Sequence, residues 1–132
     1  MCQVGDIIIV NQYKDRDNII SKHSFVVIDD ENGTIQGLPY DFVANALSSF
    51  KNNDQRKRKL SYSGNFAITS NDTVTDPHNN KDGYIKADQL YYFAKDKISY
   101  RVIGQIKEDV FNDLINFIEN GDFELLDIVD NL

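Results

Sequence analysis

The chain has 132 residues, with 14 Lys and Arg against 21 Asp and Glu, so its formal net charge is −7. One domain is the usual outcome at this length, and 41% hydrophobic and 27% charged residues are ordinary globular values, which excludes a long disordered protein. The single cysteine, Cys2, excludes a disulfide framework and a cysteine zinc site.

Neither a membrane span nor a secretion signal is expected. Apolar runs such as Ile7–Val10 are far shorter than the ~20 residues that cross a bilayer. No basic stretch leads into an apolar signal core. With one cysteine, the chain is expected to be cytoplasmic and to have no membrane partner.

The charge is unevenly distributed along the chain. Residues 107–132 hold eight acids and one base, whereas bases and acids balance over residues 1–106. The balanced part contains a dense basic cluster, Arg56-Lys57-Arg58-Lys59. A low overall pI therefore does not argue against a polyanionic partner. The alternative interpretation of the cluster is a solvated loop.

The N-terminal part predicts mainly strands. A buried strand is expected over 4–10, and a second over 25–28. The polar stretch 11–22 between them predicts a loop or hairpin connection with its tip at 15–18. The dipeptide Asn32-Gly33 predicts a hairpin turn into a third strand.

The next segment changes its hydrophobic period. Apolar residues between 42 and 50 recur at three- and four-residue spacing, which predicts a helix that Asp41 could cap and 51–53 could end. The remaining elements are predicted in this order: strand pieces at 59–63 and 65–69, a polar loop over 70–82, an extended segment over 84–93, a strand over 98–106, an amphipathic helix over 110–118 that ends at Asn120-Gly121, and a short final helix over 123–132.

The predicted fold class is mainly β (α+β). Short strands with helical insertions and a C-terminal helix favour a strongly bent antiparallel sheet or partial barrel with helices packed on it. The domain is expected to span 1–132, with an acidic C-terminal helical segment at 107–132.

The order of these features resembles a known family. The opening strand Val4–Val10, the strand Phe25–Ile28 and above all the segment Gly83-Tyr84-Ile85-Lys86-Ala87-Asp88-Gln89 are similar to segments of MazF/PemK-type toxins of toxin–antitoxin pairs. A lysine-containing connection, Gly104 and a terminal helix follow in the same order, so the resemblance covers most of residues 4–118.

The resemblance implies a fold and an activity. The implied fold is an SH3-like partial barrel, usually in a homodimer. The implied activity is metal-independent endoribonuclease cleavage of single-stranded RNA, neutralised by a small antitoxin protein. Two features depart from the family pattern: His23-Ser24 stand in place of its Arg-Pro, and no Thr follows the third strand, where the nearest hydroxyls are Ser48 and Ser49.

Three residues are the candidates for catalysis. Cleavage by the ribose 2′-OH needs a base, an acid and positive charge at the phosphorane, and His23 fits the proton-transfer roles because histidine titrates near neutrality. The resemblance places Asp88 at the family's aspartate and Lys86 at its paired arginine. In one extended strand, Lys86 and Asp88 would share a face and could meet one phosphate. The alternative for these two is a surface ion pair, and for His23 a partly exposed structural histidine.

Further basic side chains are candidates for RNA binding: Arg16, Lys22, Arg56, Lys57, Arg58 and Lys59. Unstacked bases could lie on Tyr91, Tyr92, Phe93 or Tyr100, although strand aromatics are more often in the core, and at least two of the four are expected to be buried. No metal site is predicted and no cofactor is expected, because His23 and the loop residue His78 lack ligand spacing.

Two other functions stay open at this point. One is a catalytically inactive barrel that only binds nucleic acid or a protein partner. The other is a phage or mobile-element accessory protein whose acidic tail engages a host factor.

Overall fold

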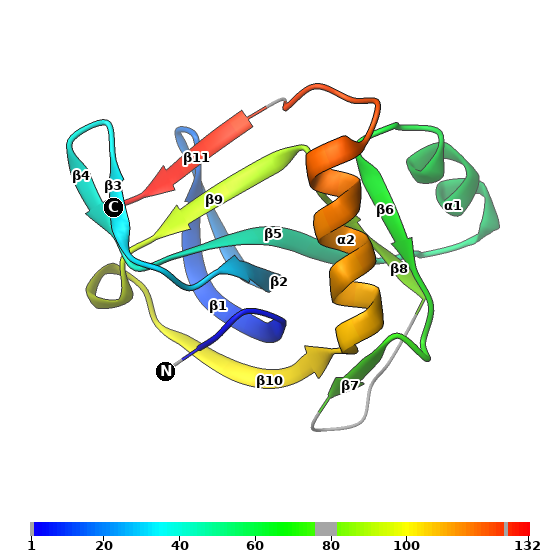
Figure 1. Ribbon diagram of the computed structural model, residues 1–132, viewed down its shortest axis with the longest axis horizontal. Coiled ribbons are helices and arrows are strands. Elements are labelled where there is room, and N and C mark those ends of the chain that lie inside the picture. The colour runs from blue at the N-terminus through cyan, green and yellow to red at the C-terminus, as the bar shows by residue number, and fades with distance from the viewer. Residues whose placement is uncertain (1, 76–81, 126) are drawn as a thin grey trace.

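The computed structural model describes residues 2–75, 82–125 and 127–132. Within these ranges the fold is mainly β, with one large, mostly antiparallel sheet, a small hairpin and two α-helices (Figure 1). The α+β class and the helix in the C-terminal region are therefore confirmed. The elements, in chain order, are β1 (Asp6–Asp15), β2 (Asn18–Asp29), β3 (Gly33–Ile35), β4 (Leu38–Tyr40), β5 (Phe42–Ser49), α1 (Asn53–Leu60), β6 (Asn65–Ile68), β7 (Thr73–Thr75), β8 (Gly83–Lys86), β9 (Gln89–Phe93), the 3-10 helix η1 (Lys95–Lys97), β10 (Tyr100–Ile106), α2 (Glu108–Asn120) and β11 (Asp127–Asn131).

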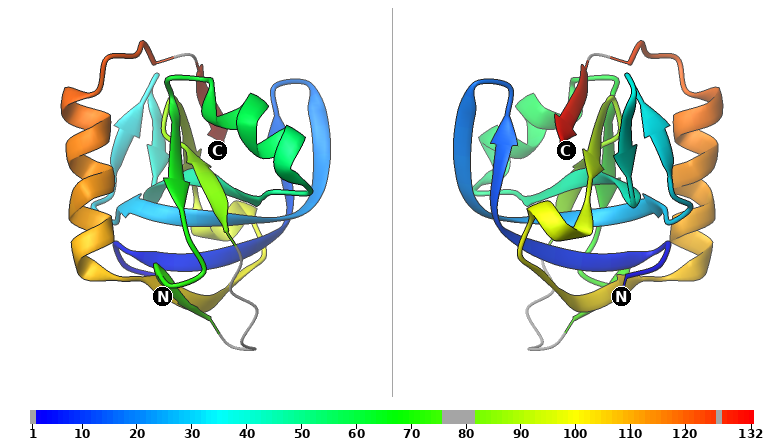
Figure 2. Two further views of the ribbon diagram at one scale, coloured as in Figure 1. Left: turned by 90° about the vertical axis from the view of Figure 1, so that its right-hand side faces the viewer. Right: turned by 90° about the vertical axis from the view of Figure 1, so that its left-hand side faces the viewer.

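The large sheet has the strand order β11-β9-β5-β2-β1-β10-β7, with β8 beside β5 and β6 beside β8. All pairs are antiparallel except β11 with β9. The sheet bends strongly, and Figure 2 shows α2 and the tip of the β1–β2 hairpin at opposite sides of the molecule. In the part of the chain that the structure describes, no backbone ladder closes the sheet into a barrel.

The β1–β2 hairpin extends both predicted strands far beyond their expected ends. The pairing continues to Asp15 opposite Asn18, so the predicted hairpin and its tip are confirmed, and the rest of 11–22 is strand rather than loop. Arg16 lies in the turn with a φ of 59°, a left-handed backbone conformation that residues other than glycine adopt uncommonly.

The predicted helix over 42–50 is wrong, because this segment is strand β5. Phe42 to Ala46 are all buried, so both faces of the strand are covered. A strand covered on both faces does not alternate polar and apolar residues, and the apolar spacing here imitates a helix. The side chain of Asn45 donates to the backbone oxygens of Lys86 (3.2 Å) and Gln89 (2.8 Å). This side chain therefore bridges β5 to the ends of β8 and β9.

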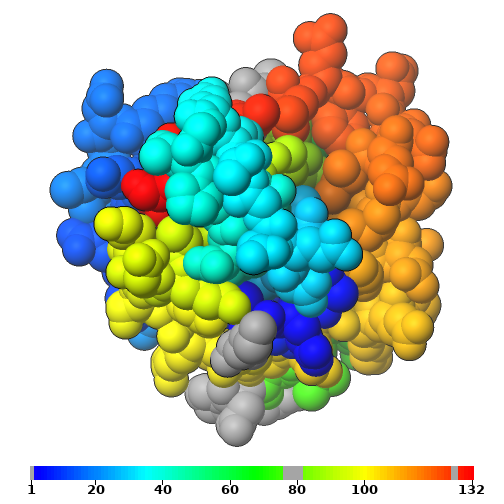
Figure 3. Space-filling view, turned by 60° about the vertical axis from the view of Figure 1, so that its left-hand side comes forward, coloured from blue at the N-terminus to red at the C-terminus, as the bar shows by residue number. Residues whose placement is uncertain are grey.

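The Asn32-Gly33 turn prediction is also wrong. The turn lies at Gln36-Gly37, between β3 and β4, and both residues have positive φ (52° and 81°). Two positive φ angles belong to the tight hairpin turn whose twist matches its strands, and glycine adopts them without strain. In Figure 3 this hairpin, in cyan, covers the middle of one face, between α2 in orange and the η1 region in yellow.

The middle of the chain differs from the prediction in three places. The basic cluster belongs to helix α1 rather than to a loop, and 59–63 is not a strand. The strand piece predicted at 65–69 is confirmed as β6, whereas the predicted polar loop contains β7. Asp76, Pro77 and His78 lie outside the described residues.

The C-terminal part contains one confirmed helix and one wrong prediction. Helix α2 ends at Asn120 and buries Leu114, as the amphipathic pattern predicts. The final helix expected over 123–132 is instead strand β11, paired in parallel with β9. The side chain of Val129, in the middle of this strand, is buried in the core. The acidic segment 107–132 is therefore helical only in its first half.

Two apolar clusters form the core. The first lies inside the bend, between β1, β2, β5, β9 and β11, and contains most of the buried aromatic side chains: Tyr13, Phe25, Phe42, Tyr91 and Phe93. The second, which includes Ile7, Ile68 and Leu114, lies under α2. Burying a large apolar side chain stabilises the fold by about 1.5–3 kcal/mol, so these clusters hold the sheet in its bent shape.

The gap between β11 and β1 is bridged by a side chain. Asn131 accepts a hydrogen bond from the backbone N–H of Lys14 (2.6 Å) and donates one to the Lys14 backbone oxygen (3.0 Å). This amide therefore acts as one rung of a ladder that the backbones do not form.

Candidate functional site

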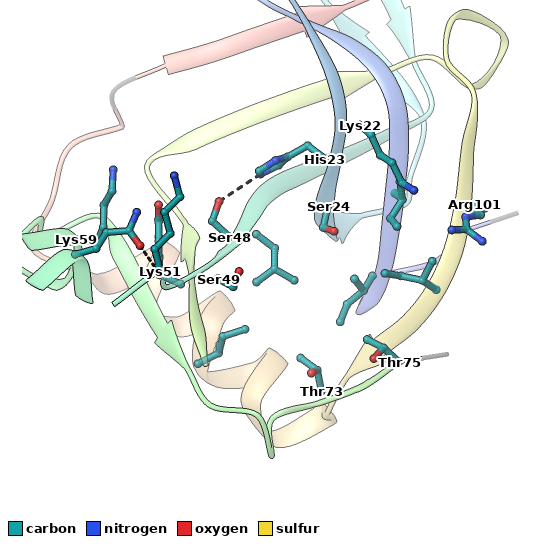
Figure 4. A pocket seen from close by; sticks show the side chains of 17 residues that line it. Lys22, His23, Ser24, Ser48, Ser49, Lys51, Lys59, Thr73, Thr75 and Arg101 are labelled. Carbon is teal, nitrogen blue, oxygen red and sulfur yellow. Dashed lines mark hydrogen bonds between the residues drawn. The ribbon is translucent and has the colours of Figure 1, made fainter. Parts of the chain in front are cut away.

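A cavity of about 720 Å³ opens on one side of the bent sheet. Strands β1, β2, β5, β6, β7, β8 and β10 contribute to its lining, and α1 forms part of its rim (Figure 4). Its size falls in the range of small-molecule sites. The lining residues are Ile7, Ile9, Lys22, His23, Ser24, Leu47, Ser48, Ser49, Lys51, Gln55, Lys59, Ile68, Thr73, Thr75, Tyr84, Arg101 and Ile103.

The course of β5 creates this cavity. Residues 42–44 of β5 pair with β9, whereas residues 47–49 pair with β8, so the strand passes from one part of the sheet to another. Its other edge pairs with β2, with Leu47 opposite Ser24. The register places His23 beside Ser48, and the Nε2 atom of His23 lies 3.3 Å from the Ser48 hydroxyl oxygen.

The cavity concentrates positive charge. Lys22, Lys51, Lys59 and Arg101 line it, and no Asp or Glu is among the described residues of the lining. The charge of this lining is therefore opposite in sign to the net charge of the chain, which is −7. Clustered like charges repel one another, and an anion bound between them removes that repulsion.

His23 is held in its neutral form by its surroundings. Burial lowers the pKa of His23, and the nearby positive charge of Lys86 lowers it further. Its ring also lies against Tyr13 and Phe25, at centroid distances of 6.2 and 5.8 Å. A neutral imidazole can accept a proton at neutral pH.

Contacts at both ends of α1 determine which basic side chains reach the cavity. Asn52 caps the helix by accepting from the backbone N–H of Gln55 (2.8 Å). Lys59 lies over the ring of Tyr84 at 5.9 Å. Arg56 lies over the ring of Phe50 at 5.7 Å, and its guanidinium is 3.9 Å from the Asp82 carboxylate.

This orientation divides the basic cluster. Lys59 lines the cavity together with Lys51, eight residues earlier, whereas Lys57 and Arg58 do not line it. Both of the latter side chains are exposed.

The structure brings three of the predicted site residues together in the cavity: Lys22, His23 and Lys59. Lys86 does not line it, although its charge acts on His23. Arg16, at the hairpin tip, and Arg56 also lie outside the lining.

The predicted pairing of Lys86 with Asp88 on one strand face is wrong. Strand β8 ends at Lys86, and Ala87-Asp88 form a turn. Asp88 is 9% exposed, and its carboxylate packs where a side chain at position 64 would otherwise lie. Gly64 is therefore needed for this close packing, and Asp88 does not line the cavity.

Sequence reasoning missed Ser48, Ser49 and Arg101 as site residues. The two serines were expected inside a helix, whereas they end β5 and line the cavity. The sequence around Arg101 does not indicate that it belongs to a site, because only the pairing of β10 with β1 brings it to the cavity.

The aromatic side chains proposed as base platforms do not reach the cavity. Tyr91 and Phe93 are buried, at 3% and 0% exposure, which confirms that at least two of the four lie in the core. Tyr92 and Tyr100 are partly exposed but do not line the cavity.

The described ranges hold no group of three or more His, Cys, Asp or Glu that could bind a metal ion. They also contain no helix long and apolar enough to cross a membrane.

Comparisons of the chain with protein-family models, curated proteins and solved structures found no match. The chemistry of the cavity is therefore the main guide to function.

Proposed function

We propose that this protein is a metal-independent endoribonuclease that binds single-stranded RNA in the cavity and cleaves it there. The observation that carries the proposal is the cationic lining around the His23–Ser48 pair, whose described residues include no Asp or Glu. Phosphate groups match the charge of this lining. The resemblance to MazF/PemK-type toxins supports the same activity.

Side chains of the cavity supply the base and the positive charge that the proposed reaction needs. Neutral His23 takes the proton of a ribose 2′-OH, whose oxygen attacks the adjacent phosphorus. The bond from phosphorus to the 5′-oxygen breaks, and that oxygen receives a proton from a cationic side chain or from water. The products are a 2′,3′-cyclic phosphate and a 5′-hydroxyl end. Lys22, Lys51, Lys59 and Arg101 would stabilise the charge that develops on the phosphorane.

The resemblance motivates further proposals about the whole protein. It suggests an SH3-like barrel, for which the strong bend of the sheet is the support. It also suggests a homodimer that acts in the cytoplasm and is neutralised by a small antitoxin protein. A small acidic reading frame next to the gene would support the antitoxin.

The test is incubation of the purified protein with a long RNA in excess EDTA, followed by mapping of the ends. We expect 5′-hydroxyl and cyclic phosphate ends, with cleavage unchanged by EDTA, and none from a His23→Ala preparation purified in parallel. Cleavage that disappears with EDTA and returns with Mg²⁺ would contradict the mechanism.

A second candidate function is binding without cleavage. The observation that favours it is the position of Asp88, which packs beside Gly64 instead of lining the cavity with His23. The described lining then holds one imidazole, that of His23, among cations. RNA that binds the cavity and remains intact after long incubation would support this candidate.

A further inference from the structure

The cations of the cavity lie in two separate groups. Lys51 and Lys59 are on the side formed by α1, whereas Lys22 and Arg101 are on the opposite side, on β2 and β10 (Figure 4). His23 lies between the two groups. We call the first group the helix wall and the second the strand wall.

The rest of the lining is largely aliphatic and carries hydroxyl groups. Ile7, Ile9 and Leu47 contribute apolar area, and Ile103 extends it toward β10. Thr73 on β7, with Thr75 beside it, supplies hydroxyls at one border. A matching ligand therefore has two separated anionic groups and a largely apolar body with polar edges between them.

One repeat of an RNA strand has this composition. Its two flanking phosphates carry the charges, and its unstacked base has an apolar face and hydrogen-bonding edges. A single phosphate ion would leave one wall without a counter-charge.

We propose that the cavity binds one nucleoside 3′,5′-bisphosphate unit of the RNA, with one phosphate on each wall and the base on the aliphatic part of the lining. This inference rests on the proposed function, because it names the part of the substrate that the cavity holds. In this placement the ribose lies between the walls, where His23 is found. The 2′-OH is then presented to the imidazole by the two phosphate contacts together.

The proposal makes a distinct demand on each wall. The 5′-phosphate and the 3′-phosphate are bound by different pairs of cations. Removing one wall should therefore weaken the binding of one nucleoside monophosphate and leave that of the other unchanged. A general positive field would weaken both monophosphates equally.

The experiment is calorimetric titration of the full chain with four probes at fixed ionic strength: uridine 3′,5′-bisphosphate, uridine 3′-monophosphate, uridine 5′-monophosphate and ribose 3,5-bisphosphate, with the adenosine series as a repeat. None has a leaving 5′-ester, so the wild type can be used. We expect the nucleoside bisphosphate to bind at least about tenfold more tightly than either monophosphate, the effect of one charge-assisted contact. It should also bind more tightly than the ribose bisphosphate, which lacks the base.

Two double variants test the walls. Lys51→Gln with Lys59→Gln removes the helix wall, and Lys22→Gln with Arg101→Gln removes the strand wall. Each should weaken the bisphosphate about tenfold and affect a different monophosphate. The matched control is Lys57→Gln with Arg58→Gln, on exposed positions of α1 outside the cavity, which should leave all four affinities unchanged.

The outcomes separate this inference from the proposed function. A bisphosphate that binds no more tightly than a monophosphate, or two double variants that weaken the same monophosphate, would overturn the two-wall arrangement while RNA cleavage could still be observed. Equal binding of the ribose and nucleoside bisphosphates would overturn the base site. A protein that cleaves RNA with the EDTA resistance described above but binds none of the probes also contradicts the inference alone.

Discussion

At the scale of single residues, the environment of His23 sets the pH range of the proposed reaction. Its pKa is lowered by burial and by the charge of Lys86, and the base must be neutral to accept a proton. Activity should therefore fall on the acid side only below the ordinary histidine value of about 6.5.

The first prediction concerns Lys86. Replacing it with Gln removes a positive charge near His23, so the pKa of His23 should rise toward its ordinary value. NMR titration of the His23 ring measures this directly, without any activity. Lys97→Gln, an exposed position outside the cavity, is the control and should leave the titration unchanged. An unshifted His23 in the Lys86 variant would show that the two groups do not interact.

The second prediction tests whether His23 acts in catalysis alone or together with Asp88. His23→Ala should lower the cleavage rate by at least ~10²-fold, the usual contribution of a general base. Asp88→Asn should reduce cleavage as strongly only if the family's aspartate role applies here. Because the carboxylate packs beside Gly64, we expect this variant to lose thermal stability rather than cleavage rate. Circular dichroism must show that both variants are folded.

At the scale of elements, one amide joins the strand β11 to β1. Asn131 is 7% exposed and makes both hydrogen bonds to the backbone of Lys14. Its removal leaves partly buried backbone groups of β1 without these partners.

The third prediction follows from this contact. Asn131→Ala should lower the free energy of unfolding by about 1–3 kcal/mol, the cost of unsatisfied buried polar groups. Urea denaturation measures the change, and Asn32→Ala, at an exposed position, is the matched control. Equal stability of Asn131→Ala and wild type would mean that water replaces the amide without loss.

The elements differ in how far the sequence predicts them, for a physical reason. Helix α2 has one face in solvent and one on the core, so its pattern is readable from the sequence alone. Strand β5 is covered on both faces, and its apolar spacing therefore misleads. The β8–β9 turn at Ala87-Asp88 is stabilised by contacts with Gly64, which are remote in sequence.

The candidate site was predictable only in part. His23, Lys22 and Lys59 could be proposed from residue type and position. Ser48 and Arg101 could not, because their place depends on strand pairings between distant parts of the chain.

At the scale of the whole molecule, opposite charges lie on opposite sides of one core. Ile7 and Ile68 line the cationic cavity and also belong to the cluster that packs against Leu114 of α2. The exposed side of α2 carries acidic residues such as Asp109 and Asp113. The acidic pI thus coexists with a cationic cavity on the other side of the core.

The fourth prediction uses the salt dependence of RNA binding. Losing two phosphate contacts, as in Lys51→Gln with Lys59→Gln, should lower the slope of log affinity against log salt by about 1.4, at roughly 0.7 per contact on single strands. Fluorescence titration of a labelled RNA with His23→Ala as the parent avoids cleavage. An equal loss in Lys57→Gln with Arg58→Gln would show that the RNA also follows the outer side of α1.

The fifth prediction is a homodimer. In the described residues β7 pairs only with β10 and β6 only with β8, so each leaves a backbone edge that needs cover. Light scattering at micromolar concentration should report about twice the 15.1 kDa of one chain. A species with the mass of one chain across that range would contradict the prediction.

The contact between Lys14 and Asn131 joins residues 117 positions apart. A nascent chain cannot form it until residue 131 has emerged from the ribosome, although the β1–β2 hairpin already ends at Asp29. Pairings that span most of a chain form slowly, because the entropy of loop closure is lost before the contact is gained. The β1–β2 hairpin therefore stays without this contact until β11 has been synthesised, and during that interval an incomplete sheet is open to chaperones and to aggregation.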